Sequence, residues 1–436
     1  MEQITKPHCG ARLDRLPDCR WHSSMFAIVA FGLLVCWSNA VGGLILAQLK
    51  ALGWTDNSTT ATFSAITTAG MFLGALVGGI IGDKTGRRNA FILYEAIHIA
   101  SMVVGAFSPN MDFLIACRFV MGVGLGALLV TLFAGFTEYM PGRNRGTWSS
   151  RVSFIGNWSY PLCSLIAMGL TPLISAEWNW RVQLLIPAIL SLIATALAWR
   201  YFPESPRWLE SRGRYQEAEK VMRSIEEGVI SQTGKPLPPV VIADDGKAPQ
   251  AVPYSALLTG VLLKRVILGS CVLIAMNVVQ YTLINWLPTI FMTQGINLKD
   301  SIVLNTMSMF GAPFGIFIAM LVMDKIPRKT MGVGLLILIA VLGYIYSLQT
   351  SMLLITLIGF FLITFVYMYV CYASAVYVPE IWPTEAKLRG SGLANAVGRI
   401  SGIAAPYAVA VLLSSYGVTG VFILLGAVSI IVAIAI

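Results

Sequence analysis

Long apolar stretches separated by short polar turns make up most of this chain. A helix that crosses a bilayer needs about 20 such residues, and twelve stretches approach or exceed that length. The predicted spans lie at 25–46, 60–81, 90–107, 113–133, 152–173 and 182–199 in the first half, and at 266–291, 302–323, 331–348, 353–375, 392–413 and 418–436 in the second. The pattern predicts an all-α membrane protein with twelve transmembrane helices.

The polar turn between the second and third spans carries a dense group of charges. Asp83, Lys84, Arg87 and Arg88 lie there, and Gly86 permits a tight reversal. Basic residues in such a turn fix it on the cytoplasmic side of a membrane. Two interpretations stay open at this point: a turn that only sets orientation, or one in which Asp83 pairs with an arginine of a neighbouring helix.

A second copy of this turn lies in the other half of the chain. Asp324 follows Asp83 at an offset of 324 − 83 = 241 and precedes Arg328. Glu380 follows Glu138 at nearly the same offset, 380 − 138 = 242. Two motifs at one offset predict two pseudo-symmetric six-helix bundles. Paired repeats in a membrane chain are typical of transporters with a site where the halves meet.

Composition excludes several classes of protein. Of the 436 residues, 56% are hydrophobic and 12% are charged, with a mean hydropathy of +0.74, so a soluble protein of this length could not bury the apolar surface. The net charge of +9 does not indicate a nucleic-acid partner, because most cations flank predicted spans. The seven cysteines are scattered and no metal-ligand spacing occurs, so we expect no disulfide, metal site or cofactor.

Charge and composition divide the chain into four parts. We expect a polar, uncleaved cytoplasmic N-terminus at 1–23, the first bundle at 24–202, a cytoplasmic central segment at 203–263, and the second bundle at 264–436, which ends within its last helix. Apolar positions from Ala218 to Val229 recur at helical spacing and predict a short amphipathic helix in the central segment, followed by a proline-rich linker. The basic loops place both termini in the cytoplasm, and in a bacterium the membrane would be the inner membrane.

Five motifs occur in order at the ends of the predicted spans. They are the turn at 79–88; Arg118 with Gly122, Gly124 and Gly126; Glu138 with Pro141, Arg145 and Gly146; Pro203-Glu204-Ser205-Pro206-Arg207; and Pro379-Glu380 with Pro383, Thr384, Arg389 and Gly390. Together they resemble the major facilitator superfamily, in its branch of sugar porters and metabolite symporters, over nearly the whole chain. The resemblance implies a monomer in the lipid bilayer whose two bundles rock around a central site.

The same resemblance implies a role for the cytoplasmic charges. Ion pairs among them would tie the halves together when the site opens outward, and would break when it opens inward. Desolvated pairs contribute on the order of a few kcal/mol, enough to bias two states. The alternative is that these charges only anchor helix ends. The predicted gating network consists of Asp83, Arg87, Arg88, Glu138, Arg145, Glu204, Arg207, Asp324, Arg328, Glu380 and Arg389.

Charged side chains inside the predicted spans are few. Arg118 lies in the fourth span, Arg399 in the eleventh, and Glu95 and His98 in the third. Charges at this depth are costly and suggest function. The guanidinium of Arg399 suits a carboxylate ligand, with a structural arginine as the alternative. A structural role explains Arg118 as well as a functional one does, and we expect Glu95 and His98 at a helix junction or a lipid edge.

Polar side chains of the fifth, seventh, tenth and eleventh spans are candidates for a substrate site. Four of them share one side of the seventh helix. Asn157 and Arg399 occupy matching places in the two halves, at an offset of 399 − 157 = 242. Ordinary packing is the alternative for the tyrosines. The predicted substrate-binding residues are Asn157, Trp158, Asn277, Gln280, Tyr281, Asn285, Trp286, Tyr372, Asn395 and Arg399.

These features predict a secondary transporter that moves a sugar, a sugar acid or a small organic acid by alternating access. The resemblance implies an acid in the first span of proton-coupled members, but 25–55 contains none, so proton symport stays open with Glu138 as the leading carrier. A facilitative uniporter of a neutral sugar and a transporter-like membrane sensor remain as alternatives. We do not expect an enzyme, because no nucleophile–base pair, metal spacing or phosphate loop occurs.

Overall fold

Helices make up nearly all of the structure, a computed structural model that describes residues 7–37, 39–141, 144–240, 253–383 and 386–436. The first helices are α1 (Cys9–Asp14), α2 (Arg20–Val35), α3 (Gly42–Ala51), α4 (Asn57–Thr85), α5 (Arg87–Ala106), α6 (Met111–Tyr139), α7 (Arg145–Asn157), α8 (Ser159–Leu170) and α9 (Ala176–Tyr201). The central segment holds α10 (Pro206–Ser211), α11 (Tyr215–Thr233) and α12 (Tyr254–Leu257). The remaining elements are α13 (Gly260–Thr293), α14 (Leu298–Met309), α15 (Gly311–Val322), α16 (Arg328–Ser347), α17 (Met352–Cys371), the π-helix η1 (Tyr372–Tyr377), α18 (Val378–Glu380) and α19 (Lys387–Ala435).

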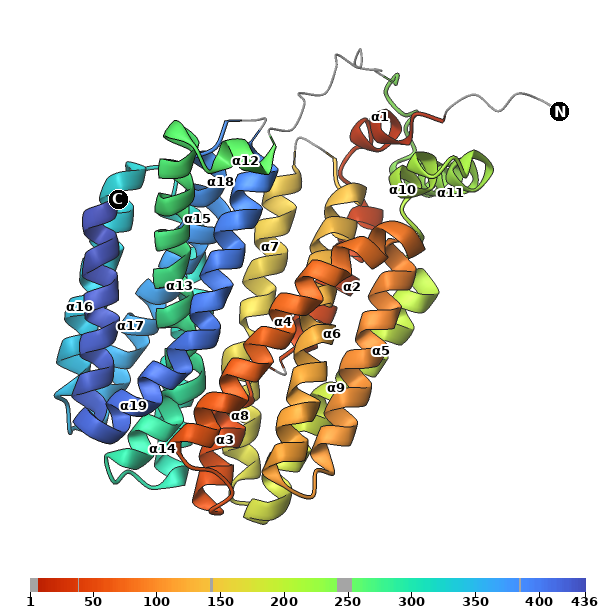
Figure 1. Ribbon diagram of the computed structural model, residues 1–436. Helices are drawn as coiled ribbons and strands as arrows, with labels where there is room; N and C mark the ends of the chain where they lie inside the picture. The colour runs from red at the N-terminus through yellow and green to blue at the C-terminus, as the bar shows by residue number, and fades with distance from the viewer. Residues whose placement is uncertain (1–6, 38, 142–143, 241–252, 384–385) are drawn as a thin grey trace.

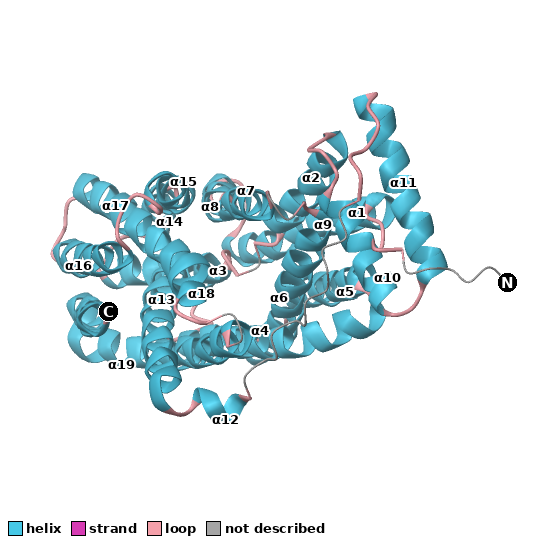
Figure 2. Cartoon of the chain, turned by 90° about the horizontal axis from the view of Figure 1, so that it is seen from above, coloured by secondary structure: helices cyan, strands magenta, loops and turns pink. Residues whose placement is uncertain are grey.

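The helices form two bundles that stand side by side, α2–α9 in one and α13–α19 in the other (Figures 1 and 2). α1, α10, α11, α12 and the last turns of α19 lie at one end of the molecule, which we call the loop end. α3, α8 and α14 reach the opposite end, which we call the far end. The two bundles correspond to the two sequence repeats.

The predicted twelve spans are confirmed. Nine helical segments among the described residues are long and apolar enough to cross a membrane. The last of them, in α19, contains two spans, because Gly417 adopts a φ of +64° and reverses the chain. The first span consists of α2 and α3, and the fifth consists of α7 and α8.

Three spans are broken along their length. The first is interrupted between α2 and α3, the fifth at Trp158 and the eighth at Phe310. Pro161 and Pro313 each lie three residues after the latter two breaks. Proline lacks an N–H and its ring clashes with the carbonyl one turn earlier, so the helix cannot continue straight. The rings of Trp158 and Phe310 lie 6.2 Å apart, so these breaks face each other across the two bundles.

Glycines bring two pairs of helices into backbone contact. At Gly70 and Gly74 of α4, an added Cβ would lie 2.3 Å and 2.1 Å from backbone oxygens of α6. At Gly311 and Gly315 of α15, it would lie 2.4 Å and 2.3 Å from backbone oxygens of α17. The offset between the two sets is 311 − 70 = 241, the same as that of the charged turns. We call these two contacts the glycine seams.

Residues 7–16 fold against the central segment and do not extend away from it as a polar tail. Cys9, Leu13 and Leu16 are fully buried, and they pack with Met222 and Val229 of α11. The predicted amphipathic helix is therefore present, but it is longer than expected and its apolar face is covered by α1 and α10. We call α1, α10 and α11 the loop-end unit (Figure 1).

Ion pairs fasten α1 within the loop-end unit. Arg12 pairs with Glu219 and with Glu226, and Arg15 Nη2 lies 2.6 Å from Glu226 Oε1. Burial alone would raise the pKa of Glu226, but hydrogen bonds from Arg12 and Arg15 outweigh burial and hold that pKa below its ordinary value.

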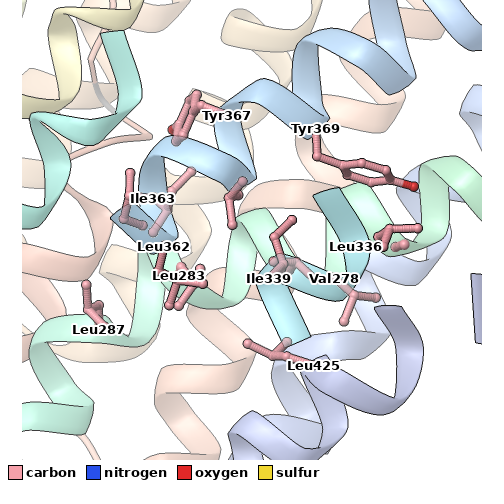
Figure 3. Packing of buried hydrophobic residues seen from close by; sticks show 14 of the residues in the cluster. Val278, Leu283, Leu287, Leu336, Ile339, Leu362, Ile363, Tyr367, Tyr369 and Leu425 are labelled. Carbon is pink, nitrogen blue, oxygen red and sulfur yellow. The ribbon is translucent and has the colours of Figure 1, made fainter. Parts of the chain in front are cut away.

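The second bundle has a continuous apolar core formed by α13, α16, α17 and α19 (Figure 3). Leu283, Leu336, Ile363 and Leu425 meet in it, and all are nearly inaccessible to solvent. Tyr369 also lies in this core, where its hydroxyl donates to the Val272 carbonyl oxygen at 3.2 Å. The core positions α13, whose other side faces the first bundle.

Candidate functional site

A group of polar and aromatic side chains lies where the two bundles meet. Tyr160 of α8 and Tyr367 of α17 come from different bundles, and their rings form an edge-to-face contact at 5.4 Å. The Tyr367 hydroxyl lies close to Gln280 of α13, and Tyr160 lies close to Asn39 in the break of the first span. We call these residues, with Tyr281 of α13, the central group.

Tyr281 connects the central group to α19 and to the first bundle. Gly402 of α19 packs between Tyr281 and Thr68 of α4, at 3.2 Å and 3.4 Å from its Cβ position. Arg399 lies one helical turn from Gly402, toward the loop end, and is partly buried. Its Nη1 atom is buried and has no hydrogen-bond partner among the described residues. A guanidinium with unused donors at this depth can bind an anion.

The four asparagines predicted at the site lie on three helices, α7, α13 and α19. Asn157, Asn277 and Asn395 each donate an amide hydrogen to a carbonyl of the preceding turn, at 2.7–2.9 Å. Asn277 lies at the crossing of α13 with Gly398 of α19. Asn285 is buried where α13 meets α3, and Asn395 is exposed. Asn277 thus lies beside the residue that precedes Arg399, and Asn395 lies one turn before Arg399 on the same helix.

Three aromatic residues of the predicted site have different surroundings. Trp158 is partly buried at the facing breaks. Trp286 is fully buried in the core of the second bundle. Tyr372 stacks on Tyr377 at 5.1 Å and packs against Gly332 of α16, so the structure does not bring it to the central group.

Arg118 is buried within the first bundle. Its guanidinium lies 4.6 Å from the ring centroid of Phe63, and Nε donates to Thr67 Oγ1 at 3.2 Å. One of its nitrogens also lies 3.0 Å from the Cβ position of Gly42 on α3. These contacts join α6 to α4 and to the first span.

Polar contacts between the bundles concentrate at the far end. Asn57 donates to Ser414 Oγ at 2.9 Å, and Asn305 donates to Ser164 Oγ at 3.0 Å. Gly43 of α3 lies against the α13 backbone, since an added Cβ would lie 2.4 Å from the Ile284 carbonyl oxygen. The bundles are therefore tightly closed at this end.

The charged turns at the loop end form ion pairs inside each bundle. Arg87 lies 2.6 Å from Asp83 and 2.9 Å from Glu138. Arg328 repeats this geometry in the second bundle, at 3.1 Å from Asp324 and 2.9 Å from Glu380. The sequence repeat is thus also a repeat of contacts, and the pairs of Arg87 and Arg328 remain within their own halves in this structure.

Glu204 lies at the N-terminus of α5. Its Oε1 atom accepts hydrogen bonds from the backbone N–H groups of Arg87, at 2.7 Å, and Arg88, at 3.2 Å. A carboxylate at this position satisfies donors that the helix leaves unpaired and interacts favourably with the helix dipole. Gly86 makes this approach possible, with a φ of +99° and no room for a side chain beside Glu204.

Other predicted gating arginines hold the loop-end segments together. Arg207 donates to the Glu138 carbonyl oxygen at 3.0 Å and to Asp14 at 2.9 Å, and Arg145 approaches the same carboxylate at 3.8 Å. In the second bundle, the guanidinium of Arg389 lies 5.2 Å from the ring of Tyr254.

Sequence reasoning missed Tyr160 and Thr68 as residues of the meeting surface. Tyr160 lies just past the break at Trp158 and immediately before Pro161, and this position beside a proline was a usable signal. Thr68 carried none, because one threonine among the small residues of α4 has no distinguishing pattern.

The sequence matches the Major Facilitator Superfamily over residues 26–406. An inner membrane metabolite transport protein of Escherichia coli, YdjE, is 44% identical over 429 residues, covering 98% of this chain and 94% of the relative. The niacin transporter NiaP of Acinetobacter baylyi is 25% identical over 403 residues, covering 92% and 89%. Among solved structures, an inward-open conformation of the E. coli xylose transporter XylE gives a TM-score of 0.74 at 16% identity, covering 95% of each chain, a likeness of fold alone. This chain belongs to the Major Facilitator Superfamily.

Proposed function

We propose that this metabolite transporter carries a small organic acid or sugar acid whose carboxylate binds Arg399. The observation that supports this most is the buried Nη1 atom of Arg399, which lacks a hydrogen-bond partner within the described chain. No Asp or Glu occurs on its helix between Gly392 and Leu413. An uncompensated charge at this depth is costly, and an anionic substrate would remove that cost while it is bound.

The neighbouring side chains suit the rest of such a molecule. Asn277 and Gln280 would bind substrate hydroxyls, and the rings of Tyr160 and Tyr281 would bound the apolar part. A neutral sugar could use the same amides, but it would leave Arg399 uncompensated. The relative named as a niacin transporter is consistent with an acid substrate, because niacin is a carboxylic acid.

Transport would proceed by alternating access between the bundles. We assign the loop end to the cytoplasm, because its turns carry most of the Lys and Arg residues, so both termini would be cytoplasmic. By relation to YdjE, the membrane would be a bacterial inner membrane. The chain is closed at the far end, which corresponds to a site that opens toward the cytoplasm. In the opposite state, we expect charges of the predicted gating network to pair between the bundles.

Uptake into proteoliposomes tests the role of Arg399. A thermal-shift screen of the purified protein with sugars, sugar acids and aromatic acids would first identify a ligand. Arg399→Lys keeps the charge but loses the bidentate geometry, so it should weaken an acid by roughly 1–3 kcal/mol, or about 5- to 150-fold. Arg200→Lys, at an exposed position on α9, is the matched control.

The proposal fails if correctly folded Arg399→Lys and Arg399→Gln bind and transport the substrate with wild-type affinity. It also fails if the substrate carries no negative charge. Misfolding of both variants, with normal behaviour of Arg200→Lys, would favour the structural arginine.

A further inference from the structure

Glu95 and His98 form a fully buried pair inside the first bundle. They lie one turn apart on α5, and both side chains are inaccessible to solvent. Glu95 Oε2 and His98 Nδ1 are 3.6 Å apart. Of the two expected locations, a helix junction or a lipid edge, the structure has the junction. Neither oxygen of Glu95 accepts a hydrogen bond in the described part of the chain.

The middle parts of three helices around the pair bring no ionisable side chain toward it. α6 approaches through Gly124, whose Cβ position is 3.0 Å from the His98 backbone nitrogen. The long middle parts of the neighbouring helices, at 119–137 on α6, 182–199 on α9 and 57–82 on α4, contain no ionisable side chain. On α5 itself, Tyr94 points to α4, where its hydroxyl donates to the Gly78 carbonyl.

Within the described chain, the first span brings a further titratable group close to Glu95. α2 reaches α5 where Gly32 meets Phe91, and the Cys36 thiol at the end of α2 lies within electrostatic range of Glu95. His22 and Arg20, the remaining ionisable groups of α2, lie at its loop-end start. Glu95 therefore faces His98 and Cys36.

A carboxylate without hydrogen bonds is costly inside a membrane protein, and one proton shared between Glu95 and His98 would remove that cost for the pair. With one proton, it is neutral overall, either as carboxylic acid with imidazole or as carboxylate with imidazolium. Removing that proton leaves a buried net negative charge, and adding a second one leaves a buried net positive charge. Exchange of a single proton is thus favourable only when water reaches the site.

The break in the first span connects this pair to the central group. Cys36, at one side of the break, faces Glu95, and Asn39, three residues later, lies close to Tyr160 of the central group. The break leads directly into α3, whose Gly43 closes the far end against α13. A movement of α3 would therefore reach the Glu95–His98 pair and the substrate side chains together.

We propose that the Glu95–His98 pair is the proton-binding site of the transport cycle, in place of the acid that the first span lacks. The proton would enter from water on one side, reside on Glu95 or His98, and leave to water on the other side. Glu138 is a poorer carrier, because it is held by Arg87 at 2.9 Å. This inference rests on the proposed transport function.

Infrared difference spectroscopy tests the site without any substrate. A pH titration of the purified wild-type protein should show the carbonyl band of a protonated buried carboxylic acid. Glu95→Gln should remove this band, and Glu177→Gln, which changes an exposed acid on α9, should keep it. If Glu95→Gln does not fold, His98→Gln offers a second test, because it removes the group that would share the proton and should therefore change the pH dependence of the band. A band that survives in Glu95→Gln, or that Glu138→Gln removes instead, overturns the proposal.

Transport then tests coupling. Glu95→Gln should reduce accumulation driven by a pH gradient at least tenfold relative to substrate exchange without a gradient. The proposal is also overturned if the ratio of gradient-driven accumulation to exchange is the same in the wild type and in Glu95→Gln. This includes the case in which the wild type exchanges substrate but does not respond to the gradient. If no organic acid or sugar acid is exchanged by wild type, the proposed function fails, while the infrared result still decides whether Glu95 is a proton site.

Discussion

The contact of Gly43 with α13 makes a strong prediction about the conformational equilibrium. In Gly43→Ala, the added Cβ would lie 2.4 Å from the Ile284 carbonyl oxygen and 2.9 Å from that of Asn285. Both obstacles are backbone atoms, so no side-chain rotation can relieve the clash. α3 must move away from α13 by about 1 Å or more to reach ordinary contact distance. The substitution therefore opposes closure of the far end.

The size of the effect follows from the cost of overpacking. Adding a methyl group to a tightly packed contact typically costs about 1–3 kcal/mol. The contact joins the two bundles, so the cost applies to the state described here and is relieved when the bundles part at the far end. A bias of that size changes the ratio of the two states by about 5- to 150-fold.

Double electron–electron resonance spectroscopy, which measures distances between two spin labels, would detect this shift in population. Labels at Leu173 and Lys299 are suitable, because both residues are exposed and lie on different bundles at the far end. Gly43→Ala should increase the population with the longer distance. Gly169→Ala is the matched control, since its Cβ position on α8 has no neighbour within 4 Å.

Two results would refute this reasoning. One is a distance distribution in Gly43→Ala that equals that of the wild type. The other is an equal shift in Gly169→Ala, which would show that any alanine at this end has the same effect.

Three further predictions concern the loop end. Glu204→Ala should lower the free energy of unfolding by about 1 kcal/mol, because it removes the cap of α5; thermal unfolding measures this, and an equal loss in exposed Glu227→Ala would contradict it. Cys9 is fully buried and its pKa is raised to about 12, first by burial, so maleimide should label its thiol slowly near neutral pH. Glu226→Gln weakens the ion pairs that hold α1 and should speed this labelling; an unchanged labelling rate in Glu226→Gln would argue against the role of the ion pairs. The pKa of Glu226 in the folded protein lies below its ordinary value of 4.5, so the stability that its ion pairs contribute is present above pH 4.5 and is lost on further acidification. Trp208 fluorescence should therefore stay constant from about pH 8 to 6 and should report the release of α1 in stronger acid. A transition near neutral pH would contradict this.

The sequence was sufficient to predict the membrane spans and their arrangement as two repeats. Long apolar runs are a strong signal, and the 241-residue offset from Asp83 to Asp324 is matched by the contacts of Arg87 and Arg328. The cap of α5 by Glu204 could not be predicted, because its partners are backbone groups 117 residues away. A carboxylate followed closely by an arginine invites an ion-pair interpretation, and only the tertiary structure shows the N–H groups beside it.

The candidate site was harder to predict than the fold. A membrane helix is apolar on the face toward lipid and on the face toward its neighbours, so periodicity does not show which side chains meet. Sequence alone could not separate Tyr372, which packs on Gly332, from Tyr367, which meets Tyr160 across the bundles. For the same reason it could not show that Glu95 faces Cys36 at the break of the first span.

The glycine seams have a mechanical consequence. Where two helices touch through their backbones, there are no side chains that can change rotamer and absorb a displacement, so α4 with α6, and α15 with α17, should each behave as one stiff plate. Stiff plates concentrate bending in the segments between them that lack a continuous hydrogen-bond ladder, here the interrupted first, fifth and eighth spans. An alanine in a glycine seam would push apart two helices of the same bundle, whereas an alanine at Gly43 would only change the angle between the two bundles. The same substitution is thus expected to impair assembly in one place and to retune motion in the other.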